Sequence, residues 1–316
     1  LILRYAGQQD VPVVSPNQDG SFYSDFRDLL EGASAGEFLK YVWTATVGVD
    51  LLHKVILRLR PYAVDGVQAQ GVYKRCLQRW VEAIERRTPL PELRRLCESF
   101  AEDFGKVELD STVQKPAVGI VGEIYVRSHP FANSNIIARL ERLGAACSLA
   151  SLAEWIYYTN FTRSDRAWRW RKYRDLFTNK IQCHIQRKIE KTLAEPLEER
   201  FGRLAEEPIE HVLELAEPYI HHSFEGEAVL SVGKMVEYHR QGFGGVVNVM
   251  PFTCMPSTIV SSQTMRISAD CDNMPILNLS FDGQEDPTLT TRLEAFVEQV
   301  RQRKRGVLTA AELISA

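Results

Sequence analysis

Hydrophobic residues recur with helical spacing along residues 25–104. In "GVYKRCLQRWVEAIERR" (71–87), Val72, Cys76, Trp80 and Ile84 follow one another in steps of four, which places them on one helix face. "LLHKVILRLRPY" (51–62) ends at a proline that stops a helix, and "TPLPELRRL" (88–96) begins another, which Gly105 ends. The pattern predicts a mainly helical region, which we bound at residues 26–112.

The pattern changes at Lys115. "KPAVGIVGEIYV" (115–126) is almost entirely apolar and has the length of a strand, which is typical of a buried parallel strand. A polar loop and a helix that Asn133 or Ser134 can cap come next, and another short apolar segment follows Gly144, as in a βαβ unit. Further apolar runs at 245–250 and 275–281 alternate with helical patterns that begin at Ser257 and at Leu289. We therefore predict an α/β fold with a Rossmann-like parallel sheet over residues 113–316.

A helical insertion of about residues 164–240 is expected to interrupt this sheet, with breaks at Pro196, Pro208 and Pro218. At the other end of the chain, the β-branched run "VPVVSP" (11–16) is interpreted as a strand, so that residues 1–25 would end an upstream α/β domain. A chain that begins at Leu1 is then expected to be a piece of a longer protein.

Composition narrows the class of protein. The formal net charge of −3 gives no reason to expect a nucleic-acid surface. No apolar run approaches the roughly 18–20 residues that span a bilayer, and the first residues lack the basic region of a signal peptide. The six cysteines include no C-x-x-C pair, which argues against a disulfide scaffold and against a self-contained zinc site. We expect a cytoplasmic protein with reduced thiols and no membrane partner.

Cys254 is the cysteine whose context suggests chemistry. In "NVMPFTCMPSTIV" (248–260) it follows an apolar run and lies between Pro251 and Pro256, which stiffen the loop. Ligands of parallel sheets bind beyond the carboxyl ends of the strands, where this loop is expected to lie. Cys254 is therefore either a metal ligand at that edge or a filler of core space, and spacing alone leaves both open.

A second candidate site follows the first predicted strand. Arg127 and the amides of a helix start near Asn133 and Ser134 could bind a phosphate or a carboxylate, with Glu123 beside them. The alternative is that Glu123 and Arg127 pair with each other and that Ser134 only caps the helix. Neither G-x-G-x-x-G nor G-x-x-x-x-G-K-[ST] occurs, so a nucleotide-hydrolysing site in this chain is not expected.

Two weaker patterns concern metals. Asp282, Glu285 and Asp286 follow the last strand-like run and could bind a hard cation, although such a cluster is more often a solvated turn. His221 and His222 could supply a metal ligand or an acid–base group, but adjacent histidines in a helix point apart.

Residues 163–191 combine basic and aromatic side chains. They hold ten Lys or Arg against three acidic residues, with Trp168 and Trp170 among them. We expect an amphipathic helix with a solvated basic face and an apolar stripe packed on the body of the protein; a docking surface for a partner is the alternative. The stripe has steps of four and comprises Tyr173, Phe177, Ile181, Ile185 and Ile189.

Three long motifs resemble a known family. They are "KPAVGIVGEIYVRSHPFANSNIIARLERLGA" (115–145), "GEAVLSVGKMVEYHRQGFGGVVNVMPFTCMPSTIV" (226–260) and "PILNLSFDGQEDPTLTTRLEAFVEQV" (275–300). They look like the proteins related to CoA-substrate-specific enzyme activases, which are relatives of 2-hydroxyacyl-CoA dehydratase subunits. The similarity is dense over residues 115–300 and less distinctive over residues 10–110.

The resemblance implies Rossmann-like domains and a [4Fe–4S] or double-cubane cluster held by cysteines of separate domains. It also implies an activase-type ATPase, fused or separate, that delivers low-potential electrons, and a paired-subunit or homodimeric assembly. In that family one ligand lies late in the chain in a Cys-x-Pro context at a strand end, and "TCMPS" matches it, so Cys254 is the implied cluster ligand. The other five cysteines match no motif of the family, and further ligands are expected upstream of Leu1.

Three interpretations remain open. The chain is part of a dehydratase-like lyase or a reductase component, and by itself is not expected to turn over a substrate. Alternatively, it is a non-catalytic module that docks a partner through residues 163–191, or an α/β domain that binds a small ligand near Arg127 and Asn133.

Overall fold

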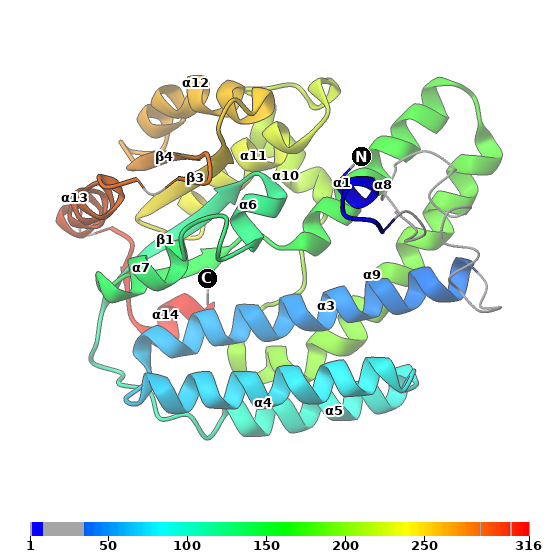
Figure 1. Cartoon of the computed structure of the whole chain (residues 1–316), viewed down its shortest axis with the longest axis horizontal. Coiled ribbons are helices and arrows are strands. Elements are labelled where there is room, and N and C mark those ends of the chain that lie inside the picture. The colour runs from blue at the N-terminus through cyan, green and yellow to red at the C-terminus, as the bar shows by residue number, and fades with distance from the viewer. Residues whose placement is uncertain (1, 9–34, 285, 304, 316) are drawn as a thin grey trace.

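Parallel strands form the centre of the computed structural model, which describes residues 2–8, 35–284, 286–303 and 305–315 (Figure 1). Their spatial order is β2 (Ala146–Leu149), β1 (Lys115–Gly122), β3 (Gly245–Pro251) and β4 (Ile276–Phe281). The short strand β5 (Val307–Leu308) pairs antiparallel with the start of β1. The prediction of an α/β fold with a Rossmann-like parallel sheet is confirmed.

Helices cover both faces of the sheet, so the strands are apolar on both sides. Val118 and Ile120 of β1 pack on one face with residues of α7 (Ile136–Arg142) and α13 (Leu289–Gln302). Ala117 and Val121 point to the other face. That face is covered by α11 (Glu227–Arg240), α12 (Met255–Asp270) and α3 (Ala35–Leu59).

The predicted helical region comprises α3, the 3-10 turn η1 (Arg60–Tyr62), α4 (Gly66–Glu85) and α5 (Leu90–Phe104); the short helix α1 (Ile2–Tyr5) lies nearer the N-terminus. Helices α3, α4 and α5 run side by side (Figure 1). Val72, Cys76 and Trp80 are buried on one face of α4, as their spacing predicted. Trp80 packs against Gly48 so closely that a Cβ at position 48 would lie 2.0 Å from its ring.

The helical insertion differs from its prediction at two points. It begins with α8 (Leu152–Arg169), where Ser151 accepts a hydrogen bond from the amide of Glu154, rather than near residue 164. Helix α9 (Tyr173–Phe201) then runs through Pro196 without ending there. Pro196 is buried on the segment that packs against α5, and this packing outweighs the one helical hydrogen bond that a proline removes.

Pro208 and Pro218 do bound the next helix, α10 (Ile209–Ala216), which the 3-10 turn η2 (His222–Phe224) follows. Beyond the predicted elements, the chain forms α6 (Ile124–Ser128) directly after β1 and α14 (Ala310–Ser315) after β5. The predicted first strand is therefore four residues too long at its end. Glu123 accepts hydrogen bonds from the amides of Tyr125 and Val126, which starts a helical turn there.

The predicted boundary between the helical region and the α/β domain, at residues 112 and 113, stays a prediction. One hydrophobic core contains Trp80 and Phe100 of the helical region together with Ala117 and Val246 of the sheet. The predicted strand at 11–16 lies outside the described residues, and so does Glu285. Among the helices that the structure describes, none is long and apolar enough to cross a membrane.

Candidate functional site

The loops that follow β1, β3 and β4 meet at one edge of the sheet, because these strands are parallel neighbours. The amide of Glu123 donates to the carbonyl of Val249 at 2.9 Å, and that of Phe252 donates to the carbonyl of Phe281 at 2.8 Å. Gly122 makes the close approach possible: its φ is +121°, and a Cβ there would lie 1.9 Å from the Val249 oxygen. The predicted common edge is confirmed.

Cys254 lies at this edge, on the residue that precedes α12. Its thiol is half-buried, and Sγ is 3.9 Å from Oε1 of Glu227 at the start of α11. Thr253, at φ 64°, turns the chain out of β3 into the helix, and Pro256 occupies the first turn of α12. The thiol is thus held at a strand–helix junction rather than inside the core.

The other cysteines of the chain have different surroundings. Burial raises the pKa of the Cys97 thiol to about 12 and that of Cys147 well above its usual range, which suits thiols that only fill space. Cys76 and Cys271 are also buried, and Cys183 is half-buried on α9. In the part of the chain that the structure describes, no two further Cys, His, Asp or Glu residues complete a metal-binding group of three with Cys254.

Arg127, proposed from the sequence as part of an anion site, is buried and bonded to the backbone. The residue is 2% exposed, and its guanidinium donates to the carbonyl oxygens of Gly122 at 3.3 Å and Ser151 at 2.9 Å. Glu123 caps α6 and does not pair with Arg127. Arg127 therefore links the end of β1 to Ser151, the residue that precedes α8.

Asn133 and Ser134 lie in the loop before α7. Asn133 is buried, donates to the carbonyls of Val126 and Arg127, and accepts from the amide of Ile136 at 3.2 Å. The residue at the N-cap position is Asn135 rather than Asn133 or Ser134, and its side chain makes no cap. Ser134, at φ 53°, makes no side-chain cap and offers its carbonyl to Arg139. The structure thus brings Arg127 and Asn133 into contact, but through the backbone and not around an open anion site.

Sequence reasoning missed a buried group of charges beside Arg127. Lys234 of α11 is 8% exposed, and its Nζ lies 3.1 Å from Oε2 of both Glu154 and Glu237 and 3.9 Å from Oε2 of Glu206. Burial disfavours the charged ammonium, but the three carboxylates outweigh it and raise the pKa of Lys234 well above its usual value. Burial also raises the pKa of Glu154 despite the nearby lysine. We refer to Lys234, Glu154, Glu206 and Glu237 as the Lys234 cluster.

Glu206 connects this cluster to the end of β2. It accepts a hydrogen bond from Ser151 Oγ at 2.6 Å and forms an ion pair with Lys54 of α3. Burial opposes its ionisation, but Lys54 and Lys234 overcome that cost and lower the pKa of Glu206 to about 2. Nearby, Asp50 accepts from the amide of Ala153, and burial raises the pKa of Asp50 to about 6. Groups whose pKa values are pushed apart in this way are typical of functional sites, although structural ion pairs also produce them.

A cavity of about 420 Å³ opens next to this cluster. Its walls come from α3, β2, the segment after α9, and α11, and they include Lys54, Arg58, Ser148, Glu206 and Lys234. Arg58 donates to the carbonyl of Phe201 at 2.6 Å, and burial lowers its pKa to about 10. The volume and the convergent polar groups are those of a small-ligand site. One segment of the sequence, "VGKMVEY", could have indicated the Lys234 cluster, because two charged residues interrupt an otherwise apolar helix there.

The apolar stripe of α9 is not packed on the body, contrary to its prediction. Phe177 is 68% exposed, and Ile181 and Ile185 are each 46% exposed, whereas Ile189 alone of the five is buried. Tyr173, Trp168 and Trp170 are also more than half exposed. The first half of α9 packs against α8 through Asn179 and Gln186, which lie on another face, so the stripe has the right period but is left exposed. We refer to Tyr173, Phe177, Ile181 and Ile185 as the α9 stripe.

In the acidic loop after β4, the carboxylates accept hydrogen bonds from neighbouring residues of the same loop. Asp282 Oδ1 accepts from the amide of Gln284, and Asp286 Oδ1 accepts from the amide and hydroxyl of Thr288. Arg292 approaches Asp286 at 3.5 Å. These contacts match the expected solvated turn.

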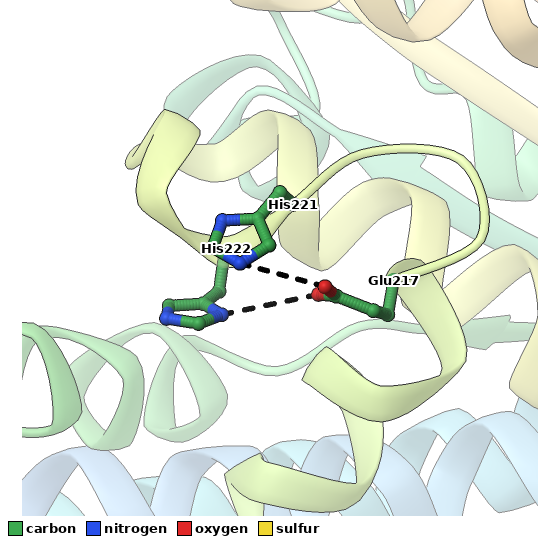
Figure 2. A group of neighbouring side chains, drawn as sticks. All are labelled: Glu217, His221 and His222. Atoms are coloured by element: carbon green, nitrogen blue, oxygen red, sulfur yellow. Dashed lines mark ion pairs between the residues drawn. The ribbon is translucent and has the colours of Figure 1, made fainter.

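The two histidines lie together, contrary to the expectation that they point apart. They are not in an α-helix: His221 precedes the 3-10 turn η2 and His222 begins it, and their ring centroids are 4.1 Å apart. Both rings approach the carboxylate of Glu217 (Figure 2). The backbone at residues 221–222 leaves the helical path after Pro218, and so adjacent side chains no longer diverge by a helical step.

We find no match to this chain among protein-family models, curated proteins or solved structures.

Proposed function

We propose that this chain is a component of ATP-coupled, low-potential electron transfer, related to 2-hydroxyacyl-CoA dehydratase components, and that Cys254 is one ligand of its iron–sulfur cluster. The observation that carries the proposal is the position of Cys254. Its thiol is half-buried at the carboxyl edge of the sheet, on a junction held by β3 and α12. A ligand on such a junction keeps its geometry better than one on a long loop. The family resemblance supplies the identity of the cofactor.

The described residues supply one cysteine at this edge, whereas an iron–sulfur cluster normally takes four cysteine ligands. The remaining ligands therefore have to come from a partner subunit or from parts of the protein outside the described residues. The proposal covers a single ligand for this reason. A bound cluster would supply one-electron transfer. The role of this chain would be to provide one of the cluster's ligands, Cys254.

Replacing Cys254 by serine is expected to lower the iron and sulfide content of the anaerobically prepared full-length protein by at least half, and to weaken the visible absorption of the cluster. The reason is that a serine oxygen is a harder ligand than a thiolate and binds such clusters less well. Iron and sulfide analysis with an electronic spectrum measures the effect. Cys183→Ser is the matched control, because Cys183 is also half-buried but lies on α9.

Unchanged iron content in Cys254→Ser would show that Cys254 is no ligand, and absence of iron from both proteins would refute the cluster. A loss that is equal in the Cys183 variant would point to unfolding instead. Far-ultraviolet circular dichroism of each variant distinguishes this case from ligand loss.

A second candidate function, docking of a partner protein, is favoured by the exposed α9 stripe. Monomeric proteins seldom expose several large apolar side chains side by side, and such patches usually mark contact surfaces. Basic residues flank the stripe, among them Arg171, Lys172 and Lys180. We propose the activase-type ATPase as the occupant, since an electron-transfer component has to contact its electron donor.

Phe177→Asp is expected to weaken association with the activase-type ATPase by about 10-fold or more, because it places a charge where an apolar anchor would be buried. The association should also weaken as salt rises, since the flanking cations are screened. Sedimentation velocity of the two proteins mixed, at low and high salt, tests both effects. Val67→Asp on α4 is the control, because Val67 is 84% exposed but lies outside the stripe. Equal affinities for the two variants would exclude the stripe as the docking surface.

A further inference from the structure

Glu217, His221 and His222 bring three metal-ligating side chains together between α10 and α11. One ligand atom from each lies within 4.8 Å of the others, and in the described part of the chain this is the one group of three His, Cys, Asp or Glu residues that does so. Figure 2 shows both imidazole rings turned toward the Glu217 carboxylate. The group lies at the surface, since the Glu217 and His221 side chains are about half exposed and that of His222 is 35% exposed.

The spacing of these atoms fits one small cation. His221 Nε2 is 3.5 Å from Glu217 Oε1, and His222 Nδ1 is 3.8 Å from Glu217 Oε2. A tetrahedral zinc ion with ligands at about 2.0–2.1 Å holds neighbouring ligand atoms about 3.3 Å apart. All three ligand atoms lie within 4.8 Å of one another. Side-chain movements of up to about 1.5 Å would bring them to the spacing of a tetrahedral zinc site.

Ser223 can act as the outer-shell partner of His221. Its Oγ is 2.7 Å from His221 Nδ1, and its amide donates to the same nitrogen at 3.1 Å. When Nε2 binds a metal, the proton of the neutral ring is on Nδ1 and needs an acceptor. The Ser223 hydroxyl provides that acceptor, while the Ser223 amide, on an exposed turn, can bond to water instead.

Packing sets the direction of the second ring. His222 lies edge-on to Phe161 of α8, with ring centroids 6.0 Å apart, and stacks at a tilt on His221. Pro218 ends α10 one residue after Glu217 and starts the turn that brings both rings back over the helix end. Two exposed ion pairs with one carboxylate would add little stability by themselves.

We propose that Glu217, His221 and His222 bind a divalent cation of the zinc class. Two imidazoles and one carboxylate suit Zn²⁺ and also Co²⁺ or Ni²⁺, whereas Mg²⁺ and Ca²⁺ prefer oxygen ligands. The fourth position of the ion faces solvent, where a water or a side chain of a partner can bind it. The metal ties the end of α10 to the segment that leads into α11. The site is separate from Cys254 and does not depend on the function proposed for that residue.

Titration of the full-length protein with Zn²⁺, monitored by calorimetry, is expected to show a site that His222→Gln and Glu217→Gln each weaken by at least about 10-fold, as loss even of an outer-shell partner commonly does. Ser223→Ala should weaken it less. Co²⁺ should give a visible absorption band typical of four- or five-coordinate cobalt, and this band should disappear in His222→Gln. Saturating Zn²⁺ should also raise the melting temperature of the native protein and not that of His222→Gln.

Two controls separate this site from other thiols and histidines. His184→Gln removes an exposed histidine of α9 that is outside the group, and Cys254→Ser removes the proposed cluster ligand. Both variants should bind Zn²⁺ as the native protein does. Zinc affinity that is unchanged in His222→Gln and Glu217→Gln, or lost in Cys254→Ser, would overturn the assignment. Absence of binding to the native protein would overturn it as well.

Discussion

Replacing Lys234 by methionine is expected to lower the free energy of unfolding by about 3–5 kcal/mol, because it leaves buried carboxylates without their cation. Lys234 Nζ is the positive charge that Glu154 and Glu237 approach at 3.1 Å, and both glutamates are almost fully buried. Methionine fills a similar volume, so the effect is electrostatic and not that of a cavity. Urea denaturation of the two proteins at neutral pH measures the difference.

The pair Lys106 and Asp103 provides a matched control, since it has the same three-residue spacing at the surface. Lys106→Met is expected to change stability by no more than about 0.5 kcal/mol. The double variant Lys234→Met/Glu237→Met should be more stable than Lys234→Met alone, because one of the uncompensated charges is removed with its partner. If Lys234→Met costs no more than Lys106→Met, the Lys234 cluster is not a buried ion network.

Trp80→Ala is expected to cost about 3–5 kcal/mol, which is typical of a large aromatic residue removed from a core. Trp80 is 1% exposed, its ring fills the notch over Gly48 of α3, and its Nε1 donates to the carbonyl of Ala45 at 3.2 Å. The cavity would open between α3 and α4, and so the loss should appear in the global unfolding transition. Chemical denaturation followed by circular dichroism tests this.

Trp170→Ala is the comparison for this prediction. Trp170 is 66% exposed at the end of α8, so its removal is expected to change stability by only about 0.5 kcal/mol or less. A large loss in Trp170→Ala would mean that the Trp170 ring is covered in the folded protein.

Local patterns predicted the elements of the sheet well. The largely apolar runs at 115–126, 245–250 and 275–281 contain β1, β3 and β4, because a strand covered by helices on both faces is largely apolar. The same rule placed the ends of β1 and β3, with Glu123 and Cys254, at one edge. The helix caps were harder to predict. Glu123 accepts hydrogen bonds from the amides of Tyr125 and Val126, which turns the end of the first apolar run into α6.

The candidate site was predicted only in part. The sequence singled out Cys254 and Arg127 but could not separate a half-buried thiol from a buried guanidinium that donates to backbone carbonyls. The Lys234 cluster joins residues from positions 154, 206, 234 and 237, and the histidine group depends on how the chain turns after Pro218. No short sequence motif marks either arrangement.

The sequence by itself determined the class of fold, the position of most helices and strands, and the edge at which Cys254 lies, because hydrophobic period and turn residues act over a few neighbours. Tertiary structure alone decided which charges are buried, which thiols are accessible and whether the α9 stripe is covered. These properties depend on contacts between residues far apart in the chain, such as Lys54 with Glu206 or Tyr157 with Glu190. The free energy of a charge or an apolar side chain is set by the groups that surround it in the folded protein and not by its neighbours in sequence.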